Sequence, residues 1–185
     1  MDANAMKRIL IDVDDVLGDF TSHTIATLKA IGGPELDPQT LTNWDLMTHI
    51  PVEWHQAVLQ QWHSQGWCGS IPVFEGAQDA ISALENIGHV TFVTAPMHES
   101  PHWMWERDRW LRTHFNASGR QIVFTEAKYL VRGDILVDDK VSNVIQWQQA
   151  NPKKQGVLWK RPSNRSAKIR YQTNSWDEIV SWFSE

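Results

Sequence analysis

Short apolar runs alternate along the chain with longer segments in which apolar residues recur at helical spacing. The short runs are rich in β-branched residues and predict strands at 8–13, 89–94, 121–124, 134–138 and 156–159. The longer segments predict helices over 19–31, 76–87, 101–115, 141–150 and 175–183. Strands that alternate with helices favour right-handed β-α-β crossovers. We therefore predict an α/β, Rossmann-like fold in which a parallel sheet carries helices on both faces.

One segment interrupts this alternation. Between about 35 and 70 the chain shows no strand pattern, and Pro51 opens a helix-like stretch there. We therefore predict a small helical cap, residues 18–72, that is inserted after the first strand. The core then consists of 1–17 and 73–185. Four of the eleven tryptophans lie in the insertion: Trp44, Trp54, Trp62 and Trp67.

The length and net charge of the chain limit the classes of protein to which it can belong. A chain of 185 residues suits one domain with a modest insertion. The net charge of −5 argues against a nucleic-acid polymer or an anionic membrane as partner, because both attract basic surfaces. Cys68 is the single cysteine and no signal peptide or spanning segment is visible, so we expect a cytoplasmic protein. Met6 is an equally good start, and residues 1–5 are expected to be a tail.

Two of the predicted strands end in carboxylates. The first ends in Asp12 and Asp14, and the fourth in Asp138 and Asp139. Unpaired buried charge is costly, whereas the carboxyl ends of strands in an open α/β sheet face the crevice where ligands bind. Carboxylates about 4 Å apart repel by roughly 4 kcal/mol at an effective dielectric near 20, so such a cluster needs a cation. Mg²⁺ prefers oxygen ligands of this kind, and the sequence therefore predicts a divalent-cation site for phosphate chemistry.

Asp12 and Asp14, two residues apart, can take the two chemical roles that phosphate transfer requires. One carboxylate of Asp12 and Asp14 can attack phosphorus, while the other protonates the leaving oxygen and later activates water. Thr94 ends the strand at 89–94, and its hydroxyl and the N–H of Ala95 are candidates for holding phosphoryl oxygens. Lys128 is a candidate for neutralising the phosphate. Taken singly, these residues also fit structural roles in turns, in helix caps or on the surface.

In chain order the residues resemble the motifs of the haloacid dehalogenase (HAD) superfamily of phosphotransferases. That family has Asp-x-Asp-x-(Val/Thr) after its first strand, then Thr or Ser, then Lys, then paired Asp. The match here is Asp12-Val13-Asp14-Asp15-Val16, Thr94, Lys128 and Asp138-Asp139. The resemblance implies that Asp12 is the nucleophile and Asp14 the general acid/base. It also implies Mg²⁺ held by Asp12, the Asp14 backbone carbonyl and Asp138, with Asp139 nearby.

Within the superfamily the chain looks most like the 5′(3′)-deoxyribonucleotidases. The closer match rests on Val16-Leu17-Gly18-Asp19-Phe20, Trp44-Asp45-Leu46, Arg109-Trp110-Leu111 and Pro162-Ser163-Asn164-Arg165. By this resemblance Phe20 and Trp44 line a nucleobase pocket, since flat aromatic rings stack on bases. Asp15 departs from the pattern, because many relatives carry glycine there, and it adds negative charge beside the site.

The sequence thus predicts a Mg²⁺-dependent phosphatase that hydrolyses a deoxyribonucleoside monophosphate through an aspartyl-phosphate. Its partner is a small phosphorylated substrate, and a homodimer is possible. Two alternatives stay open. The same chemistry can act on another small phosphomonoester such as a phosphosugar, or the crevice can belong to a non-catalytic binding module. The sequence does not distinguish 5′- from 3′-phosphates or one base from another.

Overall fold

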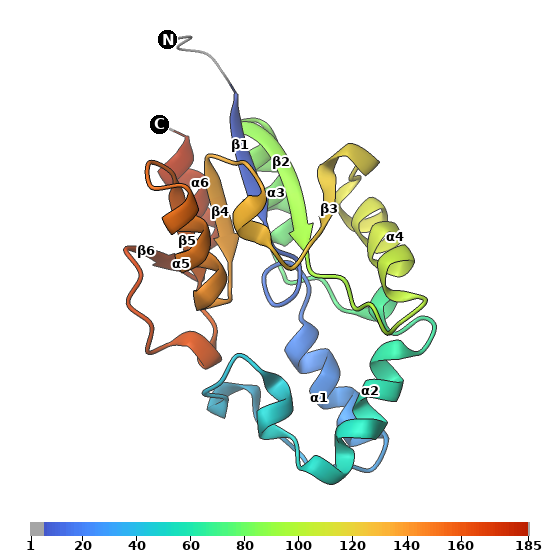
Figure 1. Ribbon diagram of the computed structural model, residues 1–185. Coiled ribbons are helices and arrows are strands. Elements are labelled where there is room, and N and C mark those ends of the chain that lie inside the picture. The colour runs from blue at the N-terminus through green and yellow to red at the C-terminus, as the bar shows by residue number, and fades with distance from the viewer. Residues whose placement is uncertain (1–5, 185) are drawn as a thin grey trace.

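A computed structural model describes residues 6–184, so the expected tail at 1–5 lies outside the described residues. The chain forms a six-stranded sheet in the order β3-β2-β1-β4-β5-β6 (Figure 1). All neighbouring strands are parallel. The strands are β1 (Lys7–Ile11), β2 (Gly88–Thr94), β3 (Ile122–Phe124), β4 (Ile135–Asp138), β5 (Gln155–Trp159) and β6 (Tyr171–Thr173).

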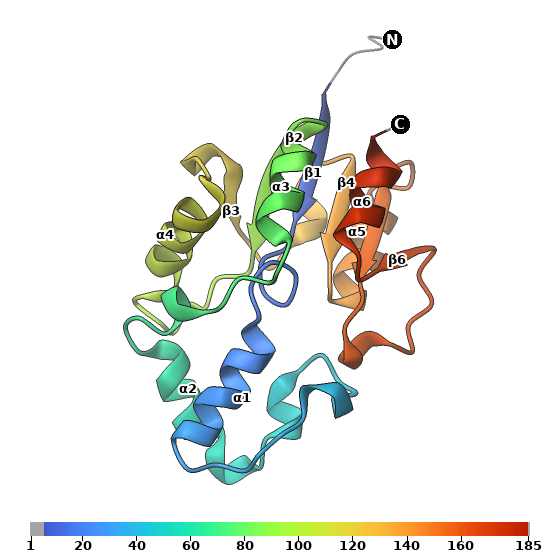
Figure 2. The same cartoon turned by 180° about the vertical axis from the view of Figure 1, so that it is seen from behind.

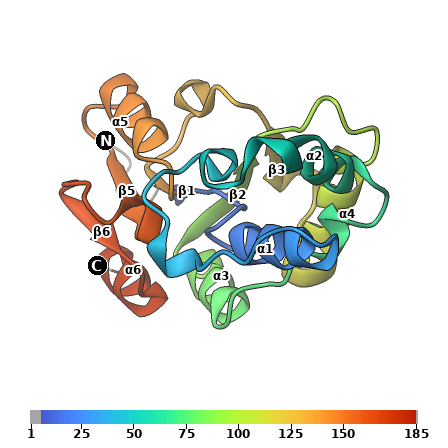
Figure 3. The same ribbon diagram turned by 90° about the horizontal axis from the view of Figure 1, so that it is seen from below.

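Helices cover both faces of this sheet. Helices α3 and α6 pack on one face and α5 on the other, with the sheet between them (Figures 2 and 3). The predicted α/β fold is therefore confirmed, whereas the edge strand β6 was not expected. The helices are α1 (Phe20–Ala30), α2 (His55–His63), α3 (Ala77–Glu85), α4 (Trp103–Phe115), α5 (Val141–Ala150) and α6 (Trp176–Phe183). No helix within residues 6–184 is long and apolar enough to cross a membrane.

The apolar residues Ile9–Ile11 of β1 explain why this strand lies inside the sheet. Successive side chains of a strand point to opposite faces, so the part of a strand that is covered on both sides is apolar. Ile9 and Ile11 belong to the larger hydrophobic core, which α3, α4 and α6 help to form. Leu10 belongs to a smaller cluster on the other face, together with Trp147 of α5. The inner position of β1 places its carboxyl end beside those of β2 and β4.

The segment between β1 and α3 contains helices and no strand. Its apolar residues form a hydrophobic cluster of their own, to which α4 contributes Trp103. In Figure 1, α1 and α2 lie beyond the carboxyl ends of the strands. The two links to the sheet run side by side, because the Phe74 N–H donates to the Leu17 carbonyl and the Asp19 N–H to the Pro72 carbonyl, each at 2.8 Å. This pairing supports the predicted division into core and cap, which stays a prediction.

Candidate active site

Lys128 joins the ends of β1 and β4. Its Nζ lies 2.6 Å from Asp12 Oδ1 and 2.8 Å from Asp138 Oδ2, and all three side chains are buried. Burial opposes the charge of Lys128, but the two carboxylates outweigh it and raise the pKa of the ammonium. Because the carboxylates stand at the ends of neighbouring parallel strands, the sheet itself brings these distant residues together.

Asp139 adds a further carboxylate to the same place. Asp12, Asp138 and Asp139 each have one carboxylate oxygen that lies within 4.8 Å of the corresponding oxygens of the other two. Burial raises the pKa of Asp12 to about 7, and burial together with Asp12 and Asp138 raises that of Asp139 well above its usual range. Lys128 supplies one positive charge against three carboxylates. Buried carboxylate oxygens of this kind fit a divalent metal ion.

Asp138 is fixed from several sides. It accepts hydrogen bonds from the Lys140 N–H at 2.8 Å and from Asn143 Nδ2 at 3.0 and 3.2 Å. Both donors come from the start of α5, so this helix holds the carboxylate in place. The sequence analysis did not single out Asn143. An asparagine side chain within a predicted helix does not by itself indicate a functional role.

Asp14 turns away from the acidic cluster. Its side chain is 27% exposed and pairs with Arg107 of α4, whose side chain is fully buried. The Asp14 carboxylate is therefore not part of the group formed by Asp12, Asp138 and Asp139. Arg107 was missed in the sequence, although its spacing from Trp103 and Trp110 places an arginine on the apolar face of the predicted helix.

Thr94 and Ala95 lie where β2 ends beside β1. The Thr94 hydroxyl is buried and, within residues 6–184, has no hydrogen-bond partner. A buried polar atom without a partner is uncommon, because losing its contact with water costs about 1–3 kcal/mol. Ala95 is exposed and lines the neighbouring cavity. This strand end is therefore suited to receive a polar ligand.

A cavity of about 300 Å³ opens between this strand end and the helical segment. Phe20 and Trp44 both line it, together with Asp14 and Ala95. Most of the remaining lining is apolar, from Leu46, Met47, Trp62, Pro96, Met97 and Trp103. Lys140 Nζ sits 3.5 Å from the centre of the Trp44 ring, so the segment after Asp139 contacts the helical segment at Trp44. The structure thus places both predicted base-pocket residues next to Asp14.

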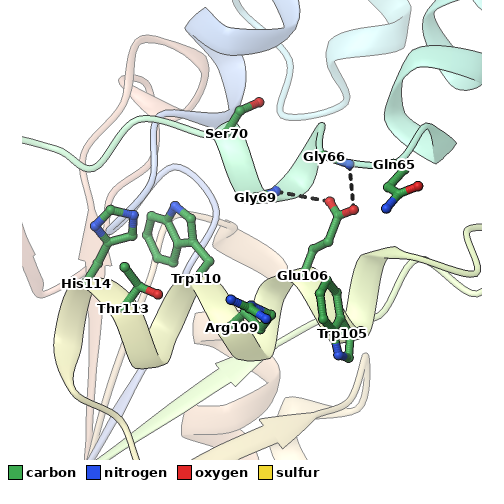
Figure 4. A pocket seen from close by; sticks show the side chains of 10 residues that line it. All are labelled: Gln65, Gly66, Gly69, Ser70, Trp105, Glu106, Arg109, Trp110, Thr113 and His114. Carbon is green, nitrogen blue, oxygen red and sulfur yellow. Dashed lines mark hydrogen bonds between the residues drawn. The ribbon is translucent and has the colours of Figure 1, made fainter.

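A second cavity, of about 510 Å³, lies along α4 (Figure 4). Its lining includes Trp105, Arg109 and Glu106, and it contains none of the clustered aspartates. Glu106 accepts hydrogen bonds from the backbone N–H groups of Gly66 at 2.6 Å and Gly69 at 3.2 Å. The Glu106 carboxylate therefore fastens the chain that returns from the helical segment to the sheet.

The parallel sheet with its covering helices has the fold of solved hydrolases of HAD type. Among solved structures, the HAD-hydrolase YfnB from Bacillus subtilis, bound to magnesium, is 14% identical with a TM-score of 0.60, covering 98% of this chain and 100% of its own. CbbY from Rhodobacter sphaeroides, in complex with phosphate, is 12% identical with a TM-score of 0.56, covering 97% and 100%. At such identities the likeness shows the fold.

The family follows from a sequence match over residues 5–183 to the model of the 5′ nucleotidase, deoxy (pyrimidine), cytosolic type C proteins. The chain belongs to this family and is a phosphatase of nucleotidase type. Human cytosolic 5′(3′)-deoxyribonucleotidase is 23% identical over 200 residues, 94% of this chain and 92% of the relative. The 5′(3′)-deoxyribonucleotidase of Bacillus subtilis is 23% identical over 176 residues, 94% and 97% of the two chains.

Proposed function

We propose that the protein hydrolyses deoxyribonucleoside monophosphates with Mg²⁺ through an aspartyl-phosphate on Asp12. The observation that carries this proposal is the linked group of Asp12, Lys128 and Asp138 beside an aromatic cavity. The names of the human and Bacillus subtilis relatives point to the same substrate class. Aromatic rings offer a base a stacking surface, which favours a nucleotide over a phosphosugar.

Asp12 is held in a way that suits a nucleophile. Its Oδ1 accepts the Val13 N–H at 2.7 Å and lies 2.6 Å from Lys128 Nζ. Within residues 6–184 no hydrogen bond reaches Oδ2, so this oxygen is available to attack phosphorus. Attack forms a bond from the Asp12 carboxylate oxygen to phosphorus, which gives an acyl phosphate, and breaks the bond from phosphorus to the sugar oxygen.

Asp14 provides the proton transfers for both steps. It gives a proton to the departing sugar oxygen and then takes one from the water that attacks the aspartyl-phosphate. That second attack breaks the Asp12–phosphorus bond and releases inorganic phosphate. Thr94, the N–H of Ala95 and Lys128 hold the phosphoryl oxygens during both steps.

The acidic cluster would hold the metal. Asp12, Asp138 and the backbone carbonyl of Asp14 would bind Mg²⁺, with Asp139 nearby, because this ion takes oxygen ligands. When bound, Mg²⁺ supplies positive charge that offsets the repulsion between the carboxylates and the phosphate. The raised pKa values of Asp12 and Asp139, which come mainly from burial, support a site that an added cation would stabilise.

The test compares the wild type with Asp12→Asn on dUMP, dTMP and a panel of phosphosugars, with Mg²⁺ or with EDTA. We expect nucleotide turnover with Mg²⁺, its loss in EDTA, and a fall of at least about 10³-fold in the variant, since covalent catalysis needs the carboxylate. Asp79→Asn on the exposed face of α3 is the control and should keep full activity.

Each alternative has its own outcome in this assay. Retained turnover by Asp12→Asn would refute the nucleophile, and a strong preference for phosphosugars would refute the nucleotide assignment. If no phosphoester is hydrolysed with Mg²⁺ present, the crevice belongs to a binding module.

A further inference from the structure

Arg107 is an unusual residue for the middle of a helix that packs against a core. Its side chain is fully buried, and its guanidinium carbon lies 5.2 Å from the ring centres of both Trp103 and Trp110. These residues stand four before and three after Arg107, so they share one face of α4. The two rings hold the guanidinium in a fixed place and shield it from water.

The buried charge has one ionic partner. Within residues 6–184 the only salt bridge of Arg107 is with Asp14, its Nε and Nη1 have no hydrogen-bond partner, and the Cys68 thiol is a further polar group beside it. The neighbouring Glu106 forms no ion pair with Arg107, and its carboxylate accepts the N–H groups of Gly66 and Gly69 (Figure 4). Burying a guanidinium with so few partners costs free energy. An apolar side chain could fill the same space without that cost, so packing alone does not account for an arginine at this position.

We infer that Arg107 is a positioning residue for Asp14. The ion pair engages Asp14 Oδ1, and within residues 6–184 Oδ2 has no hydrogen bond, in a residue that lines the cavity. One carboxylate oxygen is thereby fixed while the other exchanges the proton with the leaving oxygen and with water. This inference rests on the proposed function, in which Asp14 is the general acid/base. Arg107 is not among the residues that line the cavity, so it acts through Asp14.

The first experiment varies the leaving group. Arg107→Met should lower kcat for dUMP about 100-fold, the lower end of what a general acid contributes, with KM changed less than about threefold. p-Nitrophenolate leaves without a proton, so the initial burst of p-nitrophenol from p-nitrophenyl phosphate should stay within about threefold of wild type. Slow attack of water should then let the aspartyl-phosphate accumulate, which rapid acid quenching and mass spectrometry detect.

The control and the rescue use the same helix. Arg109→Met removes an exposed arginine that stacks on Trp105 and should leave both substrates unaffected. Arg107→Lys keeps a positive charge near Asp14 and should recover at least about tenfold of the lost kcat. In an Asp14→Asn background, Arg107→Met should cause no further loss, because the two residues act as one unit.

Three results overturn the inference. One is an equal fall in the nucleotide rate and in the p-nitrophenol burst, which marks a structural role. Another is a full additional loss in the Asp14→Asn background, and the third is no loss with Arg107→Met. If the wild type hydrolyses p-nitrophenyl phosphate but no nucleotide, the proposed substrate is wrong, and the best alkyl phosphate replaces dUMP in the same comparison.

Discussion

At the scale of single residues, Asp15 occupies a backbone conformation in the tight turn after Asp14 that side chains rarely adopt. Its φ of 57° lies in the left-handed region that favours glycine. Its carboxylate compensates by accepting the N–H of Thr21 at 3.0 Å and the Thr21 hydroxyl at 2.5 Å, and Arg161 lies 3.4 Å away. Burial raises the pKa of Asp15 to about 6, against the lowering effects of Arg161 and Thr21.

These contacts predict the effect of substitution at position 15. Asp15→Ala loses the two bonds to Thr21, worth about 1 kcal/mol each, and alanine tolerates the left-handed conformation less well than aspartate. We therefore expect urea unfolding to show a loss of about 2 kcal/mol or more. Asp15→Asn should lose less than half of that, because asparagine tolerates this conformation and can still bind the Thr21 N–H. Equal stability of the alanine variant and the wild type would contradict this account.

A sequence can predict those site residues whose place in the chain determines their place in the fold. Asp12, Thr94 and Asp138 each end a strand, and parallel neighbours bring their ends to one edge. Lys128 could be nominated only through its resemblance to a family motif. Arg107 meets Asp14 through the packing of α4 against the turn after β1, which no spacing along the chain encodes. The roles assigned to these residues remain proposals.

At the scale of elements, α4 connects the sheet to the chain returning from the helical segment. Glu106 bonds the backbone N–H groups of Gly66 and Gly69 (Figure 4), and Trp110 Nε1 donates to the Ile71 carbonyl at 2.8 Å. α4 therefore holds the returning segment at two places, through Glu106 and through Trp110. Because Arg107 follows Glu106 directly, a shift of this segment would also move the partner of Asp14.

Removal of the Glu106 carboxylate should loosen this connection. Glu106→Ala leaves two N–H groups without their partner, at about 1–3 kcal/mol each, so we expect a loss of about 2–6 kcal/mol in unfolding free energy. Glu106→Gln keeps one acceptor oxygen and should lose about half as much. Asp108→Asn on the exposed side of the same helix breaks a surface pair with Arg112 and should change stability by less than about 0.5 kcal/mol. A Glu106→Ala loss no larger than that of Asp108→Asn would show that the two bonds do not anchor the segment.

The elements that escaped the sequence analysis are short ones. β6 consists of three residues, Tyr171–Thr173, at the edge of the sheet, too few to establish an alternating pattern. The predicted helix-like stretch from Pro51 divides into a 3-10 turn, Val52–Trp54, and α2. Such turns depend on local hydrogen bonds rather than on periodicity. The long helices and the inner strands were predictable because each repeats its pattern over several residues.

At the scale of the whole molecule, the fold gathers negative charge in its interior. A chain with a net charge of −5 buries Asp12, Asp138 and Asp139 around a single lysine. Phosphate binding would bring further negative charge to the same place. Under the proposed function, the site would be active only when an added cation balances the carboxylates, and stability and metal binding would then be linked.

This linkage predicts how stability varies with pH. The pKa values of Asp12 and Asp15, about 7 and about 6, lie above the ordinary 3.8. Between about pH 4 and pH 7 the folded state then holds more protons than the unfolded state, so stability falls as pH rises. Urea unfolding in EDTA should show this fall, at up to about 1.4 kcal/mol per pH unit for each such group. Asp12→Asn should flatten the slope.

Mg²⁺ should reverse the trend, because it binds the ionised carboxylates. At about 100 times its dissociation constant, a ligand of the folded state adds about 2.7 kcal/mol to the unfolding free energy. Since protons compete for the same oxygens, a fixed Mg²⁺ concentration should stabilise the protein more at pH 7.5 than at pH 5. Asp12→Asn and Asp138→Asn should reduce this gain, whereas Asp79→Asn should keep it. Equal stabilisation at both pH values in the wild type would place the metal away from the buried aspartates, and the charge balance of the site would then need another source.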